Sequence, residues 1–154
     1  MQRKAKTHMA KEKRTLSDAA REVGSRSPLA HGVGRRKASV ARVWLRHGSG
    51  AVSVNGKDYT QYFDTELTRR TAVTACQTIP NSGSFDILAN VNGGGKVGQA
   101  DAVKLAIARA LVEFDPTLKP TLRKQNLLTV DSRKKERKKP GQPGARKKFQ
   151  FVKR

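Results

Sequence analysis

The segment VNGGGKVGQADAV, residues 91–103, has the residue types and the spacing of a phosphate-binding turn. Gly93, Gly95 and Gly98 fit the pattern G-x-G-x-x-G, with a hydrophobic alternation before them and a helical apolar pattern after them. Backbone N–H groups at a helix N-terminus, here beside Lys96, can bind any phosphate. The alternative is a tight strand-to-helix turn whose glycines serve only a positive φ.

A nucleotide-using enzyme is the weakest interpretation of these glycines. A dinucleotide site needs the fingerprint after the first strand of a parallel sheet, with an acidic strand end about 20 residues later. Here the preceding strand is the third, and residues 115–120 (DPTLKP) form no strand pattern. A P-loop also fails, because Gln99 and Ala100 follow Gly98 where Lys and Ser or Thr are required. With a basic chain, the expected phosphate belongs to a nucleic-acid backbone.

A second basic segment, GRRK at 34–37, lies at the start of a predicted strand and contains Arg35, Arg36 and Lys37. Arg42 and Arg46 continue a basic ridge along the same strand, with Trp44 between them. We interpret the ridge as a phosphate contact, against the alternative of a solvated charge run. Trp44 is either a packed side chain or a base-stacking one, and the first is the commoner use of tryptophan.

The C-terminal segment RKKERKKPGQPGARKKFQFVKR, residues 133–154, is the strongest signal of nucleic-acid binding. Pro140, Gly141, Pro143 and Gly144 prevent a continuous helix, and no core-forming pattern follows Asp131. Phe149 and Phe151 can stack on bases or pack in apolar niches. The alternatives are a nuclear-localisation tract or a disordered solubilising tail. The cations expected to bind phosphates are Arg133, Lys134, Lys135, Arg137, Lys138, Lys139, Arg146 and Lys147.

Net charge is the feature of the composition that says most about the binding partner. Lys and Arg number 33 against 12 Asp and Glu, a net charge of +21. Residues 131–154 alone carry 11 basic and 2 acidic groups. Such a tail repels itself when free, and a polyanion that neutralises it releases counterions. Charge alone would also suit a DNA-compacting protein or a general RNA chaperone, which binds diffusely.

Other classes of site find little support. No catalytic motif is present, no cofactor is indicated, and His8, His31 and His47 have no metal-ligand spacing with the single cysteine, Cys76. Cys76 lies on an apolar stripe and is expected in the core. No apolar run approaches the roughly 20 residues of a membrane span, and no signal peptide is apparent. We therefore expect a soluble, intracellular protein without a membrane partner.

The periodicity predicts the elements that position these residues. Strands are expected at 37–46 and 51–56, paired as a hairpin through HGSG, and a third strand at 85–92. Helices are expected from a cap at Asp64 to about Thr78, and from the glycines to Asp115, which precedes a proline. Leu105 and Val112 lie on the face of the second helix opposite its main apolar stripe. We therefore expect a neighbouring element to cover part of that opposite face. Short segments are expected at 58–63 (helical), 117–126 (helical) and 127–131 (strand).

Long blocks of the sequence resemble small-subunit ribosomal protein nine of the bacterial or organellar type. They are GVGRRKASVARVWLRHGSGAVSVNGKDYTQYF, the run from VNGGGKVGQADAV to RKKERKKPG, and the ending ARKKFQFVKR. The resemblance covers about residues 32–154. It implies an α+β fold with a mixed four-stranded sheet, helices on one face and a left-handed βαβ crossover, like the second domain of ribosomal protein S-five, plus a long basic extended tail. The implied regions are a globular rRNA-binding domain at 32–130 and a tail at 131–154.

Residues 1–31 lie outside the resemblance and read as a basic, disordered extension. Met9 could be an alternative start that makes residues 1–8 a leader. A transit peptide is disfavoured by its acidic residues, Glu12, Asp18 and Glu22. The expected location is the ribosome in the cytoplasm, or in an organellar matrix.

The resemblance also implies partners. Its members bind the head (3′ major domain) of small-subunit rRNA, beside neighbouring ribosomal proteins, through segments that match GRRK and Gly93, Gly94, Gly95 and Lys96. The family's terminal Lys-Arg, matched by Lys153 and Arg154, contacts the anticodon stem-loop of peptidyl-site tRNA. The chain departs from the family's usual ending at Lys147, Lys148, Phe149 and Val152. Lysine keeps the charge but lacks the bidentate fork of arginine, which leaves the path of the tail less constrained.

Overall fold

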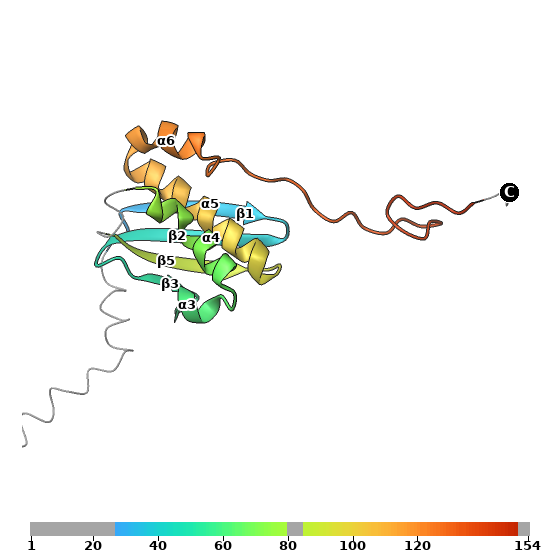
Figure 1. Cartoon of the computed structure of the whole chain (residues 1–154), viewed down its shortest axis with the longest axis horizontal. Coiled ribbons are helices and arrows are strands. Elements are labelled where there is room, and N and C mark those ends of the chain that lie inside the picture. Colours follow the sequence, from blue (N-terminus) through green and yellow to red (C-terminus); the bar gives the residue numbers. More distant parts are fainter. Residues whose placement is uncertain (1–26, 80–84, 151–154) are drawn as a thin grey trace, which may run out of the picture.

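A mixed sheet of five strands organises the described part of the computed structural model, residues 27–79 and 85–150 (Figure 1). The strands lie in the order β1-β2-β5-β3-β4. Their bounds are Ala30–Arg36 (β1), Ser39–His47 (β2), Val52–Val54 (β3), Lys57–Asp58 (β4) and Phe85–Asn92 (β5). β1, β2 and β5 form an antiparallel set, whereas β3 pairs parallel to β5 and antiparallel to β4.

The helices lie on one side of this sheet. The helix α5 crosses β1 and β2, and α4 packs beside α5 (Figure 1). A 3₁₀ turn and a short helix follow α5 and end with Lys124. The bounds are Tyr59–Tyr62 (α3), Glu66–Gln77 (α4), Lys96–Phe114 (α5), Pro116–Leu118 (η2) and Lys119–Lys124 (α6).

The core follows the two-residue period of the strands and the apolar stripe of α5. Along β2 and β5, every second side chain is buried, and the intervening ones are half-buried or exposed. The predicted inward face of 85–92 is therefore confirmed. In α5, Val103, Ile107 and Leu111 are buried, and so is Leu105 on the other side, as expected from a covered far face. The opposite face of the sheet carries no helix of the described chain.

Two glycines let α5 approach β1 at backbone distance. A Cβ on Gly32 would lie 2.0 Å from the carbonyl oxygen of Ala106, and one on Gly34 would lie 1.9 Å from that of Ala102. No side chain larger than hydrogen fits there without moving the helix. This contact fixes the middle of α5 against β1.

The predicted topology needs three corrections. The strands at 37–46 and 51–56 do not form a hairpin, because β5 lies between β2 and β3. β2 pairs instead with β1, a strand that the sequence pattern did not indicate. The sheet has five strands rather than four, since the Asn55-Gly56 turn returns the chain into the two-residue β4. The parallel β3–β5 pair is joined through α3 and α4, and the left hand of that crossover stays a prediction.

Local details also differ from the sequence patterns. Thr65, not Asp64, is the N-cap residue of α4. Residues 127–131 form no strand, because the Leu127 side chain is buried in the core and the Leu127 N–H donates to the carbonyl of Leu122 (3.1 Å). The short helical segments at 58–63 and 117–126 are confirmed in α3, η2 and α6. β1 begins at Ala30, before the expected domain start at 32, and residues 1–26 of the extension expected at 1–31 lie outside the described residues.

Candidate nucleic-acid interface

Two segments far apart in the sequence, the β1–β2 turn and the glycine loop, lie against each other at one end of the sheet. A Cβ on Gly93 would lie 2.6 Å from the carbonyl oxygen of Ala38, and one on Gly94 would lie 2.1 Å from the Ser39 hydroxyl. The Ser39 hydroxyl donates to the carbonyl of Gly93 (3.0 Å). We call this the end surface, made of Arg35, Arg36, Lys37 and Gly93, Gly94, Gly95 and Lys96.

The glycine loop is a tight turn between β5 and α5. Gly93 and Gly94 have φ values of 73° and 65°, in the region that favours glycine. Gly95 has an extended backbone and forms the N-cap of α5 without a side-chain hydrogen bond. The glycines are therefore required, before any role in phosphate binding, by the backbone geometry of this turn. The loop also leaves the first turn of α5 at the surface, where Val97 is 62% exposed.

Lys96 is held against an aromatic ring. Its Nζ donates to the carbonyl of Tyr62 (2.7 Å) and lies 3.7 Å from the centroid of the Tyr62 ring. The Tyr62 hydroxyl in turn donates to the Gln99 side chain (2.9 Å). This cation–π contact fixes the ammonium beside the glycine loop. The sequence pattern gave no sign of Tyr62 as its partner.

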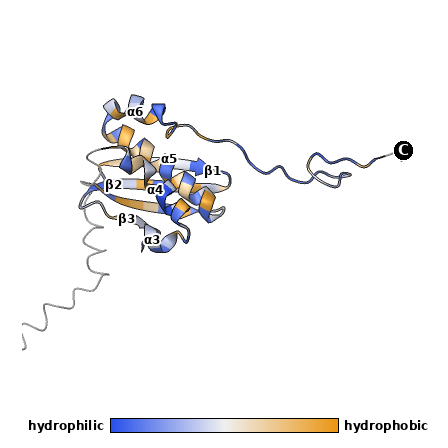
Figure 2. Ribbon diagram, in the orientation of Figure 1, coloured by the Kyte–Doolittle hydropathy of each residue, from blue (hydrophilic) through white to orange (hydrophobic). Residues whose placement is uncertain are grey.

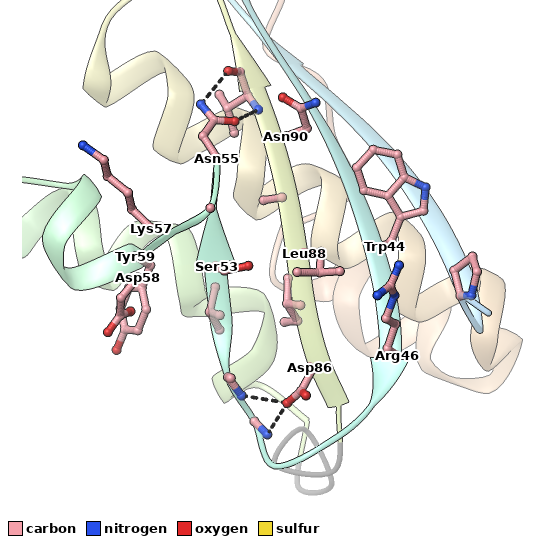
Figure 3. A pocket seen from close by; sticks show the side chains of 18 of the residues that line it. Trp44, Arg46, Ser53, Asn55, Lys57, Asp58, Tyr59, Asp86, Leu88 and Asn90 are labelled. Atoms are coloured by element: carbon pink, nitrogen blue, oxygen red, sulfur yellow. Dashed lines mark hydrogen bonds between the residues drawn. The ribbon is translucent and has the colours of Figure 1, made fainter. Parts of the chain in front are cut away.

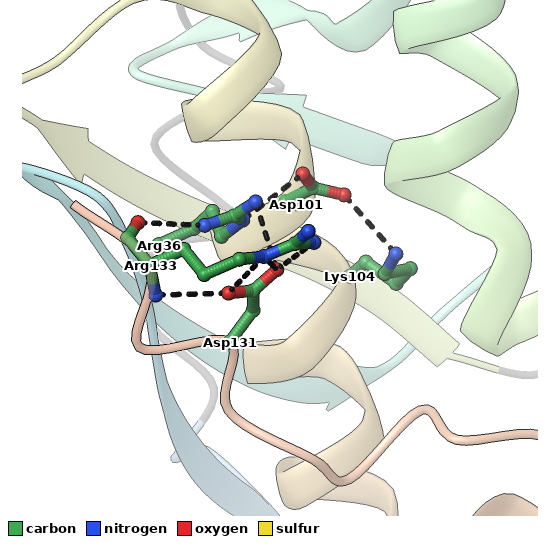
Figure 4. A network of polar contacts seen from close by, with 5 residues as sticks. All are labelled: Arg36, Asp101, Lys104, Asp131 and Arg133. Carbon is green, nitrogen blue, oxygen red and sulfur yellow. Dashed lines mark hydrogen bonds and ion pairs between the residues drawn. The ribbon is translucent and has the colours of Figure 1, made fainter. Parts of the chain in front are cut away.

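A cluster of charges ties the start of the tail to the end surface (Figure 4). Arg36 pairs with Asp131 (Nη2–Oδ2, 2.8 Å) and donates from Nη1 to the carbonyl of Arg133 (3.0 Å). Its Nε lies 3.7 Å from Asp101, which also pairs with Lys104 (3.1 Å). We call these five residues the tail clamp. The sequence placed Arg36 and Arg133 among the phosphate-binding cations and did not indicate their acidic partners.

Asp131 is the centre of the tail clamp. The Arg133 guanidinium donates to its carboxylate from Nε (2.9 Å to Oδ2), and the Arg133 backbone N–H donates as well (2.9 Å). The hydrogen bonds from Arg133, with the charge of Arg36 nearby, hold the pKa of Asp131 far below its ordinary value. The same pairing raises the pKa of Arg133.

Beyond the clamp, the tail is mainly hydrophilic (Figure 2), and its cations are exposed. Residues 131–139 form neither helix nor strand, and a turn follows in which Gly141 has a φ of 67°. Arg146 folds back onto Glu136 (Nε–Oε1, 3.1 Å) and lowers the pKa of that carboxyl. Among the tail cations expected to bind phosphate, those that are exposed and form no ion pair with the described chain are Lys134, Lys135, Arg137, Lys138, Lys139 and Lys147.

The remaining predicted cations are distributed between two faces and the chain end. Arg35 and Lys37 are exposed on the end surface, and Arg42 is exposed on the uncovered face of the sheet. None of these three forms an ion pair with any residue of the described chain. Lys153 and Arg154, expected at tRNA, lie outside the described residues.

The described residues offer little for other chemistry. They hold no group of three or more His, Cys, Asp or Glu side chains that could bind a metal ion. Burial raises the pKa of the Cys76 thiol to about 11, which suits a core residue rather than a nucleophile. In 27–79 and 85–150, no helix has the length and apolarity needed to cross a membrane.

The comparisons decide what kind of protein carries this interface. A family model described as ribosomal protein S9/S16 matches residues 34–154. The chain belongs to this family. It is 51% identical over 128 residues to the small ribosomal subunit protein uS9 of Methylacidiphilum infernorum, covering 83% of this chain and 93% of the relative. The uS9 proteins of Maridesulfovibrio salexigens (50% over 124 residues) and Chlorobaculum parvum (53% over 122) are similarly related, covering 80% and 79% of this chain and 95% of each relative.

Membership in the S9/S16 family confirms the resemblance drawn from the sequence. The chain is a ribosomal protein, of a structural family, and not an enzyme. The alternative of a nucleotide-using enzyme is thereby set aside. RNA binding is a general property of such a family, so the end surface, the uncovered face and the tail are the places to look for it.

Proposed function

We propose that this S9-family protein is a structural constituent of the small ribosomal subunit that binds rRNA of the subunit head. The observation that carries the proposal is the end surface, where exposed Arg35 and Lys37 lie beside the glycine loop and the N-terminus of a 19-residue helix. Cations, backbone N–H groups and a helix dipole converge there, as phosphate binding requires. Near it starts a tail whose exposed lysines and arginines can neutralise further phosphates.

The cations divide into two roles in this proposal. Arg35, Lys37, Arg42 and the exposed cations of the tail bind rRNA phosphates directly. Arg36 and Arg133, which pair with carboxylates of the same chain, position the tail, and Lys96 supports the glycine loop. The rRNA-facing set, including these positioning groups, is Arg35, Arg36, Lys37, Arg42, Gly93, Gly94, Gly95, Lys96, Arg133, Lys134, Lys135, Arg137, Lys138, Lys139, Arg146 and Lys147.

The end of the tail has a second proposed partner. Lys153 and Arg154 contact phosphates of the anticodon stem-loop of peptidyl-site tRNA, while the remainder of residues 131–154 threads through rRNA toward that site. A chain of exposed cations with hinges at Gly141 and Gly144 suits such threading. Neighbouring proteins of the subunit head complete the environment, and the protein stays ribosome-bound.

Removal of residues 152–154 tests the tRNA contact. We expect subunits that contain the shortened chain to assemble normally and to lose peptidyl-site tRNA faster, because only the terminal charges are missing. The matched control replaces Lys134 and Lys135 with glutamine, which removes the same number of cations far from the chain end. Filter binding of tRNA to purified subunits gives the comparison. Equal tRNA affinity in shortened and intact subunits would contradict the proposed contact.

A further inference from the structure

The uncovered face of the sheet carries an ordered set of side chains that the strand register defines. His31, Trp44, Leu88 and Ser53 lie side by side in one row across β1, β2, β5 and β3. The His31 and Trp44 rings are 5.3 Å apart between centroids, tilted by 43°. The next row places Arg42 opposite Asn90, and both are exposed. An aromatic and apolar row thus adjoins a row of hydrogen-bonding and cationic groups.

This face is hollowed into a groove of about 1340 Å³ (Figure 3). β5 forms its floor with Leu88 and Asn90, Trp44 stands on one side, and Lys57 and Tyr59 line the other. The volume exceeds the roughly 300–1,000 Å³ of typical small-molecule pockets. An open groove of this size along a strand suits a segment of a polymer better than a metabolite.

We propose that this groove binds an unpaired segment of RNA, with a base stacked on Trp44 and phosphates held by Arg42 and Lys57. The inference rests on the proposed function and adds a second RNA surface to it. Aromatic side chains on an open sheet, flanked by cations, are the arrangement that binds single-stranded nucleic acid, since every base has a face that can stack. The exposed amide of Asn90 can hydrogen-bond a base edge.

Charge in the groove favours RNA over an acidic or purely apolar protein segment. Its two carboxylates are engaged within the chain. Asp86 Oδ1 accepts the backbone N–H groups of Ser49, Gly50 and Ala51 (2.9, 3.1 and 3.0 Å). Asp58 accepts from the N–H and the hydroxyl of Thr60 (3.3 and 3.0 Å). By contrast, Lys57 in the groove has no ion pair within the described chain, and neither has Arg42, which lies opposite Asn90 beside the groove.

The groove also continues into the end surface. Along β5 the outward side chains run from Leu88 through Asn90 to Asn92, and Gly93 follows directly. At this end of the face, Arg35 of β1 lies opposite Val40 of β2 in the strand register. One strand of RNA could therefore leave the groove and pass its phosphates to the glycine loop without a gap.

Trp44 provides a direct test, because it is the single tryptophan of the chain. The full-length protein is titrated with labelled oligouridylate of about 12 nucleotides and, separately, with a duplex RNA of equal length. Binding is followed by anisotropy of the label, and occupancy of the groove by Trp44 fluorescence. We expect the single strand to quench Trp44 at the same concentration at which anisotropy saturates, and the duplex to bind without quenching.

The two readouts separate the possible failures. Saturating anisotropy with unchanged Trp44 emission would overturn the groove as an RNA site while leaving rRNA binding intact. Shielding of Trp44 from acrylamide only in the assembled subunit, with no quenching by RNA, would overturn it in favour of a protein neighbour. No RNA binding at all would contradict the proposed function itself.

Two isosteric variants make the test specific to the groove. Asn90→Asp adds one negative charge beside Arg42, and Gln77→Glu adds the same charge on the exposed side of α4. At low salt we expect Asn90→Asp to weaken single-strand binding about fivefold, as like charges at contact distance predict, and to reduce the quenching. Gln77→Glu should change neither. Equal weakening by both variants would show that only net charge matters and would overturn the proposal.

Discussion

Arg35 and Arg36 are neighbours in the sequence, yet the structure gives them different tasks. Arg35 is exposed and has no ion pair in the described chain, whereas Arg36 joins β1 to the start of the tail through Asp131 and the Arg133 carbonyl. Residue type and spacing predicted a basic cluster correctly. They could not predict this division, because the partners of Arg36 lie far along the chain and are brought there by the fold.

Gly94 and Gly95 allow a test of the glycine loop at the residue scale. Gly94→Ala should lower the free energy of unfolding by about 2 kcal/mol, since its φ of 65° is unfavourable for alanine and its Cβ would meet the Ser39 hydroxyl. Gly95→Ala should cost less than about 1 kcal/mol, the loss of a glycine N-cap, because nothing lies within 4 Å of its Cβ. Urea unfolding of both full-length variants gives the comparison. A larger loss for Gly95→Ala would contradict the turn geometry.

At the scale of elements, the sequence predicted most reliably the strands and helices whose buried positions carry large apolar side chains. β2, β5 and α5 were predicted because their inward residues alternate or repeat clearly. β1 was missed because two of its inward positions are Gly32 and Gly34, which pack on the backbone of α5 and carry no hydrophobic signal. Close helix-to-strand packing thus removes the pattern on which strand prediction depends.

The hairpin prediction failed for a tertiary reason. HGSG is a plausible turn, but the loop that contains it is held by Asp86 of β5, which accepts three of its N–H groups. β5 therefore inserts between β2 and β3, and the Ala51 carbonyl accepts the N–H of Ile87 (2.8 Å). The residues of a turn cannot predict that a strand some thirty residues further along the sequence will pair between the two strands that the turn connects.

The tail clamp is a testable element-scale feature. Arg36→Ala should release the start of the tail, because Asp131 and the Arg133 carbonyl lose their contact with β1. In ¹⁵N relaxation of the full chain, we expect the heteronuclear NOE of Ser132 and Arg133 to fall toward that of the distal tail. Arg35→Ala, one residue away and outside the clamp, is the matched control. Unchanged dynamics in Arg36→Ala would refute the clamp.

The pH dependence of the clamp follows from Asp131. Its pKa is depressed, so the carboxylate stays ionised and the clamp stays closed at neutral pH and through the range, near 3.9, where an ordinary Asp titrates. The contact is lost only as pH falls below that range. Asp131→Asn should therefore show at neutral pH the mobility that the wild type shows only in strong acid.

At the scale of the whole molecule, the chain combines a small packed domain with a tail that buries little of itself (Figures 1 and 2). Composition predicted this division, since the last 24 residues carry 11 of the basic groups. What composition could not predict is which tail cations are engaged within the chain. Arg133 and Arg146 pair with carboxylates, so the lysines carry most of the charge offered to a polyanion.

This distribution predicts the salt dependence of RNA binding. Replacing Lys134, Lys135, Lys138 and Lys139 with glutamine should reduce the slope of log K against log salt by about 3 to 4 for duplex RNA, roughly 0.9 for each lost phosphate contact. The control neutralises four exposed cations of the helix layer, Arg70, Lys119, Arg123 and Lys124. Titrations at several salt concentrations measure both slopes. Equal slopes in the two variants would mean that the tail does not contribute selectively.

The proposed function requires this chain to bind defined sites in small-subunit rRNA and to contact peptidyl-site tRNA with its terminus. Ultraviolet crosslinking in the native cells, followed by sequencing of the attached RNA, tests it most directly. We expect sharp sites in the rRNA of the subunit head, and a tRNA anticodon-stem signal that disappears when residues 153 and 154 are removed. Crosslinks spread over all transcripts, with no preferred rRNA site and no loss of signal in the shortened chain, would contradict the proposed function.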